Sequence, residues 1–140
     1  MPGASYSVFD HTADIGIEVV APSREELYAT AATALFDILA DISRVGPGTV
    51  QEVTVTGEDA ADLLVRWLSE LLYLHDVEGW LYREFRIDEV TEHRLSARVY
   101  GERYDPDRHT IKTEIKAVTY HQVFAGRIER GWMARLVLDV

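Results

Sequence analysis

The chain has 140 residues, a formal net charge of −10 and no cysteine. Its length fits a single domain, and the absence of cysteine excludes disulfides, thiolate metal ligands and cysteine nucleophiles. The negative charge argues against direct binding of nucleic acid, because phosphate contacts need clustered lysine and arginine, and it favours a basic protein partner. We recognise no signal peptide and no membrane-spanning segment, so we expect a soluble cytoplasmic protein.

The N-terminal part of the chain predicts a short tail and two strands. We expect residues 1–5 to form a disordered tail and residues 6–140 a single domain. Residues 6–9 predict a short strand, and residues 14–20 alternate in polarity, which is typical of a half-buried strand. Asp14 begins this strand on its polar face, and the opposite face carries the apolar residues Ile15, Ile17 and Val19.

A helix is predicted next, because its start has a capping signal. Ser23 and Glu26 form a capping box, in which each side chain can satisfy a backbone donor beside the other. Apolar residues then follow helical spacing as far as Ile42. The Gly-Pro-Gly sequence of residues 46–48 is expected to end this element.

The rest of the chain predicts a second helix and several strands. A strand at residues 50–56 precedes a helix that begins near Glu58 or Asp59, where acidic residues favour the positive end of the helix dipole. The later predicted strands are residues 80–90, 93–104, 110–120, 122–130 and 132–140. Short turns between neighbouring strands favour antiparallel pairing, so the expected fold class is α+β, with a largely antiparallel sheet and two helices packed on it.

Residues 10–16 (DHTADIG) form the first candidate site. Asp10, His11 and Asp14 bring two carboxylates and an imidazole within five residues, a combination that can bind a cation. The alternative is a polar turn, in which Asp10 or Thr12 bonds local backbone groups.

The last residues form a second candidate site. Asp139 and Val140 follow an apolar strand and place a side-chain carboxylate beside the α-carboxylate. Several oxygen donors close together suit a hard cation such as Ca²⁺. The alternative is a frayed and solvated chain end.

A third candidate lies in residues 112–121 (KTEIKAVTYH). If this segment is a strand, the even-numbered positions from Lys112 to Tyr120 share one face. A lysine and a tyrosine on this face, beside a carboxylate cluster, could neutralise or position an anion. The alternative is a solvated sheet face with cross-strand ion pairs. The sequence contains no nucleophile motif, phosphate-binding loop or dinucleotide fingerprint, so no catalytic residue is assigned.

The same segments resemble the motifs of the archease family. The resemblance runs in order from about residue 6 to residue 140. It is carried by residues 10–16, 67–76 (WLSELLYLHD), 101–109 (GERYDPDRH), 115–121 (IKAVTYH) and the ending 138–140 (LDV). The chain departs from the family at Gln122, which follows His121 where a glycine is expected.

The resemblance implies a function and a set of site residues. Archeases are small α+β proteins that promote the GTP-dependent guanylylation and multiple turnover of the RtcB-type RNA ligase in tRNA splicing and RNA repair, without being ligases themselves, so we expect this chain not to be an enzyme. The family's metal site matches Asp14, Asp139 and Val140, and the expected divalent cation is Ca²⁺, with Mn²⁺ or Mg²⁺ as alternatives. Lys116 matches the lysine of the functional surface. With Asp10 and His11 it is expected to face the ligase.

Two other functions stay open at this point. One is a general chaperone or protein-interaction module with a structural metal site, which would need a sizeable exposed apolar patch. The other is a metal-dependent hydrolase that uses Asp10, His11 and Asp14, although nothing in the sequence implies an activated water or a general base. The resemblance favours the ligase activator. Its expected partner is the ligase, a protein, and we expect no direct binding to nucleic acid or to a membrane.

Overall fold

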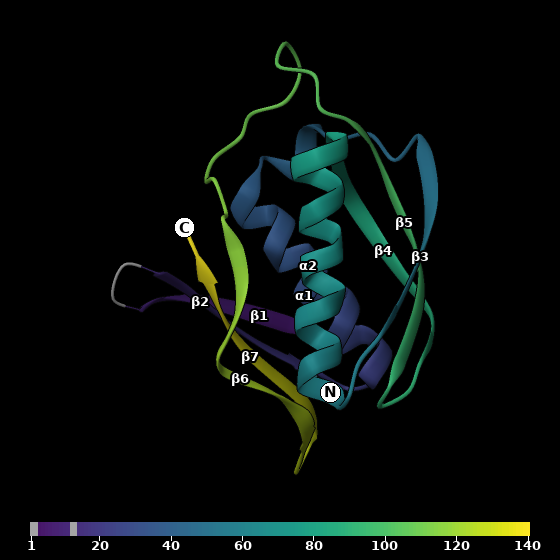
Figure 1. The fold of residues 1–140 in the computed structure, drawn as a ribbon, viewed down its shortest axis with the longest axis vertical. Helices are drawn as coiled ribbons and strands as arrows, with labels where there is room; N and C mark the ends of the chain where they lie inside the picture. Colours follow the sequence, from purple (N-terminus) through teal and green to yellow (C-terminus); the bar gives the residue numbers. More distant parts are fainter. Residues whose placement is uncertain (1–2, 12–13) are drawn as a thin grey trace.

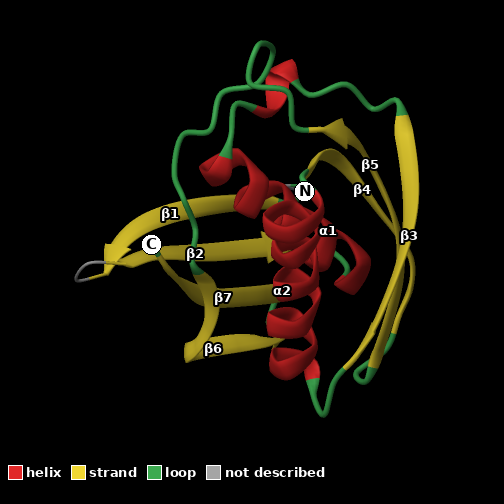
Figure 2. Ribbon diagram, turned by 45° about the horizontal axis from the view of Figure 1, so that its top comes forward, coloured by secondary structure: helices red, strands yellow, loops and turns green. Residues whose placement is uncertain are grey.

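Two helices lie between two antiparallel sheets, so the molecule has three layers (Figure 2). The computed structural model describes residues 3–11 and 14–140. The four-stranded sheet has the order β1 (Ser5–His11), β2 (Asp14–Ala21), β7 (Gly131–Asp139) and β6 (Ala117–Ile128). The three-stranded sheet has the order β3 (Thr49–Thr56), β5 (Arg94–Arg103) and β4 (Trp80–Val90). The predicted α+β class with antiparallel pairing is confirmed, and the strands divide into two sheets.

The first helix, α1 (Arg24–Leu39), begins as the capping box predicts, because the Ser23 hydroxyl accepts the backbone N–H of Glu26 at 3.1 Å. It ends earlier than predicted. Ala40 is extended and pairs with Ile111, and a separate 3₁₀ turn, η1 (Ile42–Arg44), follows. The helical spacing that continues to Ile42 therefore belongs to two elements.

The second helix, α2 (Ala60–Glu78), begins at the Asp59 cap and ends at Gly79, which has a left-handed conformation (φ 78°). The apolar residues along one side of it, from Leu63 to Leu72, are buried. The Trp67 indole N–H donates to the carbonyl of Tyr28 at 2.9 Å, which joins α2 to α1 inside the core. Both helices contact both sheets, so the helical layer holds the two sheets together. Among the described residues, no helix combines the length and the apolar character that a membrane crossing requires.

Residues 104–116 are a crossover between the sheets, and the strand predicted at residues 110–120 is wrong for most of its length. This segment runs from the end of β5 to the start of β6 (Figure 1). Its N–H groups at Lys112 and Thr113 donate to the carbonyl of Leu39 at the end of α1. The predicted common face from Lys112 to Tyr120 therefore does not form, and Val118 within it is buried.

Strand β6, which pairs with β7 in the last hairpin, is one strand with an irregularity. The sequence predicted two strands here, which meet at this irregularity. Thr119 pairs with Val137, but the next pair is Phe124 with Arg135, so β6 bulges between them. Gln122 lies in this bulge. Within the described part of the chain it is the one residue other than glycine with a positive φ, at 53°. The glycine expected there by the resemblance would adopt this conformation without strain.

We predict that Gln122→Gly leaves the free energy of unfolding unchanged or raises it by up to about 1 kcal/mol. The left-handed conformation costs an L-residue roughly 1 kcal/mol, which offsets the extra entropy of glycine in the unfolded chain. The matched control is Thr54→Gly in the regular strand β3, which should lose about 0.5–1 kcal/mol. Denaturant unfolding measures both. An equal loss for the two variants would contradict the assignment of strain to Gln122.

Candidate functional site

Strand pairing brings the residues predicted for the metal site to one end of the four-stranded sheet. The pairing of Ile15 with Leu138 makes Asp14 and Asp139 the next positions along β2 and β7. In the neighbouring pair of strands, Ala117 of β6 lies opposite Asp139. The N–H of Lys116 donates to the carbonyl of Asp139 at 2.8 Å. The end marked C lies on the same side of the molecule as the end of β1 and the start of β2 (Figures 1 and 2).

The same pairing decides on which face the two aspartates lie. Ile17, Leu136 and Leu138 are fully buried, so these alternate positions face the helices. Neighbouring positions point to the opposite face. Asp14 and Asp139 therefore lie together on the outer face, where Asp139 is exposed and Asp14 is half-buried.

The donor chemistry of this end of the sheet fits a hard cation. No cluster of three or more metal-ligating His, Cys, Asp or Glu side chains exists among the described residues. The implied set differs from such a cluster, because it has two side-chain carboxylates, and its third ligand is a main-chain oxygen of Val140. All of these donors are oxygen atoms, which Ca²⁺ and Mg²⁺ prefer.

The structure separates Asp10 from Asp14. Asp10 pairs with Ile15 across β1 and β2, and directly opposite residues share a face. Asp10 is therefore on the face of Ile15, and Asp14 is on the other. His11 ends β1 opposite Asp14; its side chain, with Thr12 and Ala13 of the predicted turn, lies outside the described residues.

Comparison with known proteins decides the family. A sequence model described as "Archease protein family (MTH1598/TM1083)" matches residues 6–140. The chain belongs to the archease family. The protein archease of Pyrococcus abyssi is 44% identical over 136 residues, which cover 94% of this chain and 96% of the relative. The protein archease of Methanosarcina barkeri is 39% identical over 142 residues, with coverage of 99% and 97%.

Two solved structures of archease type have the same fold. The solution structure of Methanobacterium thermoautotrophicum protein 1598 has a TM-score of 0.80 at 32% identity and covers 96% of this chain and 98% of that one. The crystal structure from Thermotoga maritima, described as "an archease, possible chaperone", has a TM-score of 0.62 at 25% identity and covers 94% of each chain. The arrangement of helices and sheets is thus that of the archeases.

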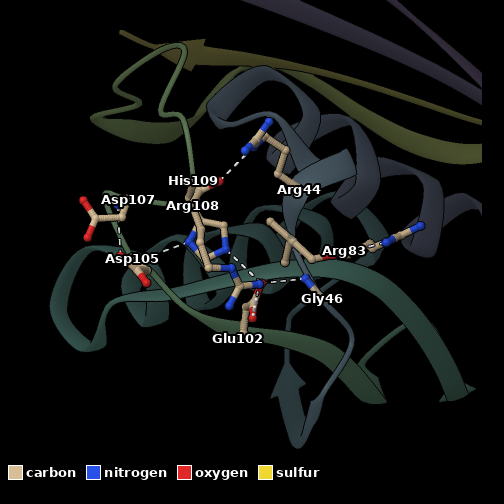
Figure 3. Close-up of polar contacts among 9 residues, drawn as sticks. Arg44, Gly46, Arg83, Glu102, Asp105, Asp107, Arg108 and His109 are labelled. Carbon is tan, nitrogen blue, oxygen red and sulfur yellow. Dashed lines mark hydrogen bonds and ion pairs between the residues drawn. The ribbon is translucent and has the colours of Figure 1, made fainter.

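A second polar cluster, which the sequence prediction missed, surrounds Glu102 near the start of the crossover (Figure 3). We call it the Glu102 latch; it consists of Gly46, Glu102, Asp105, Arg108 and His109. His109 is the one buried polar side chain among the residues described, with 4% exposure. Its Nδ1 accepts the N–H of Asp105 at 2.8 Å, so the neutral ring donates through Nε2 to Glu102 Oε2, also at 2.8 Å.

The Glu102 carboxylate joins three segments of the chain. It accepts the backbone N–H of Gly46 at 2.6 Å and an Arg108 N–H at 2.7 Å, in addition to the His109 bond. These donors, with the Gly46 N–H the largest effect, lower the pKa of Glu102 to about 2. The family segment 101–109 carries these residues, but their bond to Gly46, 56 positions away, has no local signal in the sequence.

We predict that Glu102→Gln is less stable than the wild type at pH 7 by about 1.5–3 kcal/mol, the range for hydrogen bonds to a charged group. Because folding lowers the pKa of Glu102 from 4.5 to about 2, the stability that its charge contributes is present above pH 4.5 and is lost as the pH falls toward 2. The variant should therefore lose less stability than the wild type over that window.

The matched control is Glu84→Gln, which removes an exposed ion pair with Arg86 (2.8 Å). Such pairs contribute little, so this variant should follow the wild type. Thermal unfolding measured from pH 7 to pH 2 compares the three proteins. Identical pH profiles for the Glu102 variant and the wild type would show that the latch does not hold an ionised carboxylate.

Proposed function

We propose that this chain is a protein cofactor of an RtcB-type RNA ligase, which promotes guanylylation of the ligase by GTP and its multiple turnover in tRNA splicing and RNA repair. The observation that carries the proposal is the meeting of Asp14, Asp139 and Lys116 at one exposed end of a sheet in a chain of the archease family. The proposal assigns no turnover chemistry and no catalytic residue to the chain.

The proposal includes a divalent cation, Ca²⁺ with Mn²⁺ or Mg²⁺ as alternatives, held by Asp14, Asp139 and a carboxyl oxygen of Val140. Hard cations take six or more oxygen ligands, so a site with few protein ligands leaves positions for oxygens of a partner or a nucleotide. Asp14 and Asp139 bind and orient the cation, and the nearby Lys116 orients a phosphate or a ligase carboxylate by its compact positive charge.

The charge of the chain supports a protein partner. A net charge of −10 repels nucleic acid, and it attracts an enzyme that itself binds RNA through basic residues. We therefore propose that the chain binds the ligase and not the RNA, and that it does so in the cytoplasm. The second candidate function is a general chaperone or interaction module, favoured by the description of the Thermotoga maritima relative as a possible chaperone. Light scattering of a heat-denatured client, with and without the protein, tests that candidate.

We predict that calorimetry shows Ca²⁺ or Mn²⁺ binding to the wild type and at least tenfold weaker binding to Asp14→Ala. The reason is that the variant loses one of only two side-chain carboxylates at the site. An extension of several residues after Val140 replaces a carboxylate by an amide carbonyl and should also weaken binding, whereas an extension before Met1 should not. Equal cation affinity of the wild type and Asp14→Ala would show that the cation does not bind at this end of the sheet.

We predict that Lys116→Ala sharply slows guanylylation of the ligase at an unchanged melting temperature. Lys116 is exposed, and removal of an exposed side chain changes stability by less than about 0.5 kcal/mol. Lys116→Arg should restore activity only in part, because a planar guanidinium does not reproduce a compact ammonium. Lys112→Ala, a change of the chain's other lysine, is the control and should activate as the wild type does. Full activation by Lys116→Ala would exclude Lys116 from the functional surface.

A further inference from the structure

The outer side of α2 carries apolar side chains that its packing does not explain. Trp67, Leu68 and Leu71 of this helix are fully buried in the core. Tyr73 and Val77, four positions apart and so on one side of the helix, are 49% and 65% exposed. Neighbouring exposed apolar groups of this kind offer a contact surface to another molecule.

Two surface grooves flank Tyr73. The groove toward β3 has a volume of about 400 Å³ and is lined by Val55, Thr56, Arg66, Ser69, Glu70 and Tyr73. The groove toward β6 has a volume of about 280 Å³, and its lining on α2 consists of Ser69, Leu72, Tyr73, Asp76 and Val77. Tyr73 thus stands on a ridge between two hollows, where an aromatic ring can contact a partner on both sides.

The groove toward β6 leads to the proposed functional site. Its other wall is formed by Lys116, Ala117 and Val118. Lys116 in turn donates its N–H to Asp139. A protein that fills this groove therefore lies against Lys116 and beside the two aspartates, so one partner can cover both surfaces.

Each groove beside Tyr73 contains a carboxylate that can pair with a basic partner, and the cations of the two grooves are Arg66, which pairs with Asp62, and Lys116. Asp62, one helix turn before Arg66, is occupied: it accepts bonds from Tyr120 (2.7 Å) and Arg66 (2.9 Å). The carboxylates of Glu70 and Asp76, which line the two grooves, make no hydrogen bond or ion pair within residues 3–11 and 14–140. The half-buried Glu70 and the exposed Asp76, beside an aromatic ring, suit lysine or arginine side chains, which an enzyme that handles RNA presents on its surface.

We propose that the side of α2 around Tyr73 and Val77 is the surface on which the ligase docks, through a basic segment that inserts an apolar side chain beside Tyr73. This inference rests on the proposed function, and it assigns binding of the ligase and activation of the ligase to two different surfaces. The Tyr73 side binds the ligase, and the end of the sheet with Lys116 activates it.

The test measures the rate of ligase guanylylation as a function of the concentration of this protein. For Tyr73→Ala/Val77→Ser we expect the half-maximal concentration to rise at least tenfold, as is typical of a central aromatic contact, while the maximal rate stays the same. Val50→Ser is the matched control, because Val50 is 52% exposed on β3, away from both grooves. It should behave as the wild type.

Charge-reversal variants test the electrostatic contribution to binding separately from the apolar contact. Asp76→Lys should raise the half-maximal concentration, and the effect should shrink at high salt. Glu52→Lys, an equal charge change at an exposed position of β3, is its control. Circular dichroism confirms that each variant is folded, and Tyr73→Ala alone replaces the double variant if that one is not.

Two results would overturn the docking surface while the proposed function stands: an unchanged half-maximal concentration, whether or not the maximal rate falls, or an equal effect of the Val50 control. Light scattering of the protein alone can give a third. A dimer that the double variant dissociates would assign the face to a second copy of the chain. If the wild type fails to accelerate guanylylation, the proposed function fails, and this surface fails with it.

Discussion

The pairing register of β2 and β7 is the constraint on which the site depends. Ile17, Leu136 and Leu138 are fully buried against the helices, so a slip of one residue would expose these side chains and turn the aspartates inward. The apolar core therefore enforces the position of Asp14 and Asp139, two residues that are 125 positions apart in the chain. The burial of their neighbours thus places both aspartates on the outer face of the sheet.

The rest of the fold positions Lys116 beside Asp14 and Asp139. Because the helices contact both sheets, the chain must cross from β5 in one sheet to β6 in the other, and residues 104–116 make that crossing. The Glu102 latch fixes the beginning of the crossover. In its middle, two backbone N–H groups donate to the carbonyl of Leu39 at the end of α1, and at its end the N–H of Lys116 donates to the carbonyl of Asp139. Contacts of the crossover with α1 and β7 thus determine the position of Lys116, which directly precedes β6.

Local patterns in the sequence predicted most helices and strands. The features that they did not predict depend on contacts between residues far apart in the chain. The Ser23 cap and the alternation after Asp14 depend on neighbours within a few residues, so α1 and β2 were predicted correctly at their starts. Alternation also suggested a strand at residues 110–120, but it does not show whether a partner strand exists, and the carbonyl of Leu39 takes N–H groups of this segment. The bond from Gly46 to Glu102 has no local pattern. The grouping of Asp14 with Asp139 and Val140 came from the family resemblance, and the register of β2 and β7 supplies its physical reason for the two aspartates.

The most direct test of the account is a time course of guanylylation of the purified ligase with GTP, with and without this protein. We predict faster guanylylation when wild-type protein is present, an effect that is lost when the divalent cation is chelated, and no guanylylated product when the ligase is omitted. The same rate with and without the protein, in the presence of Ca²⁺ or Mn²⁺, would contradict the account.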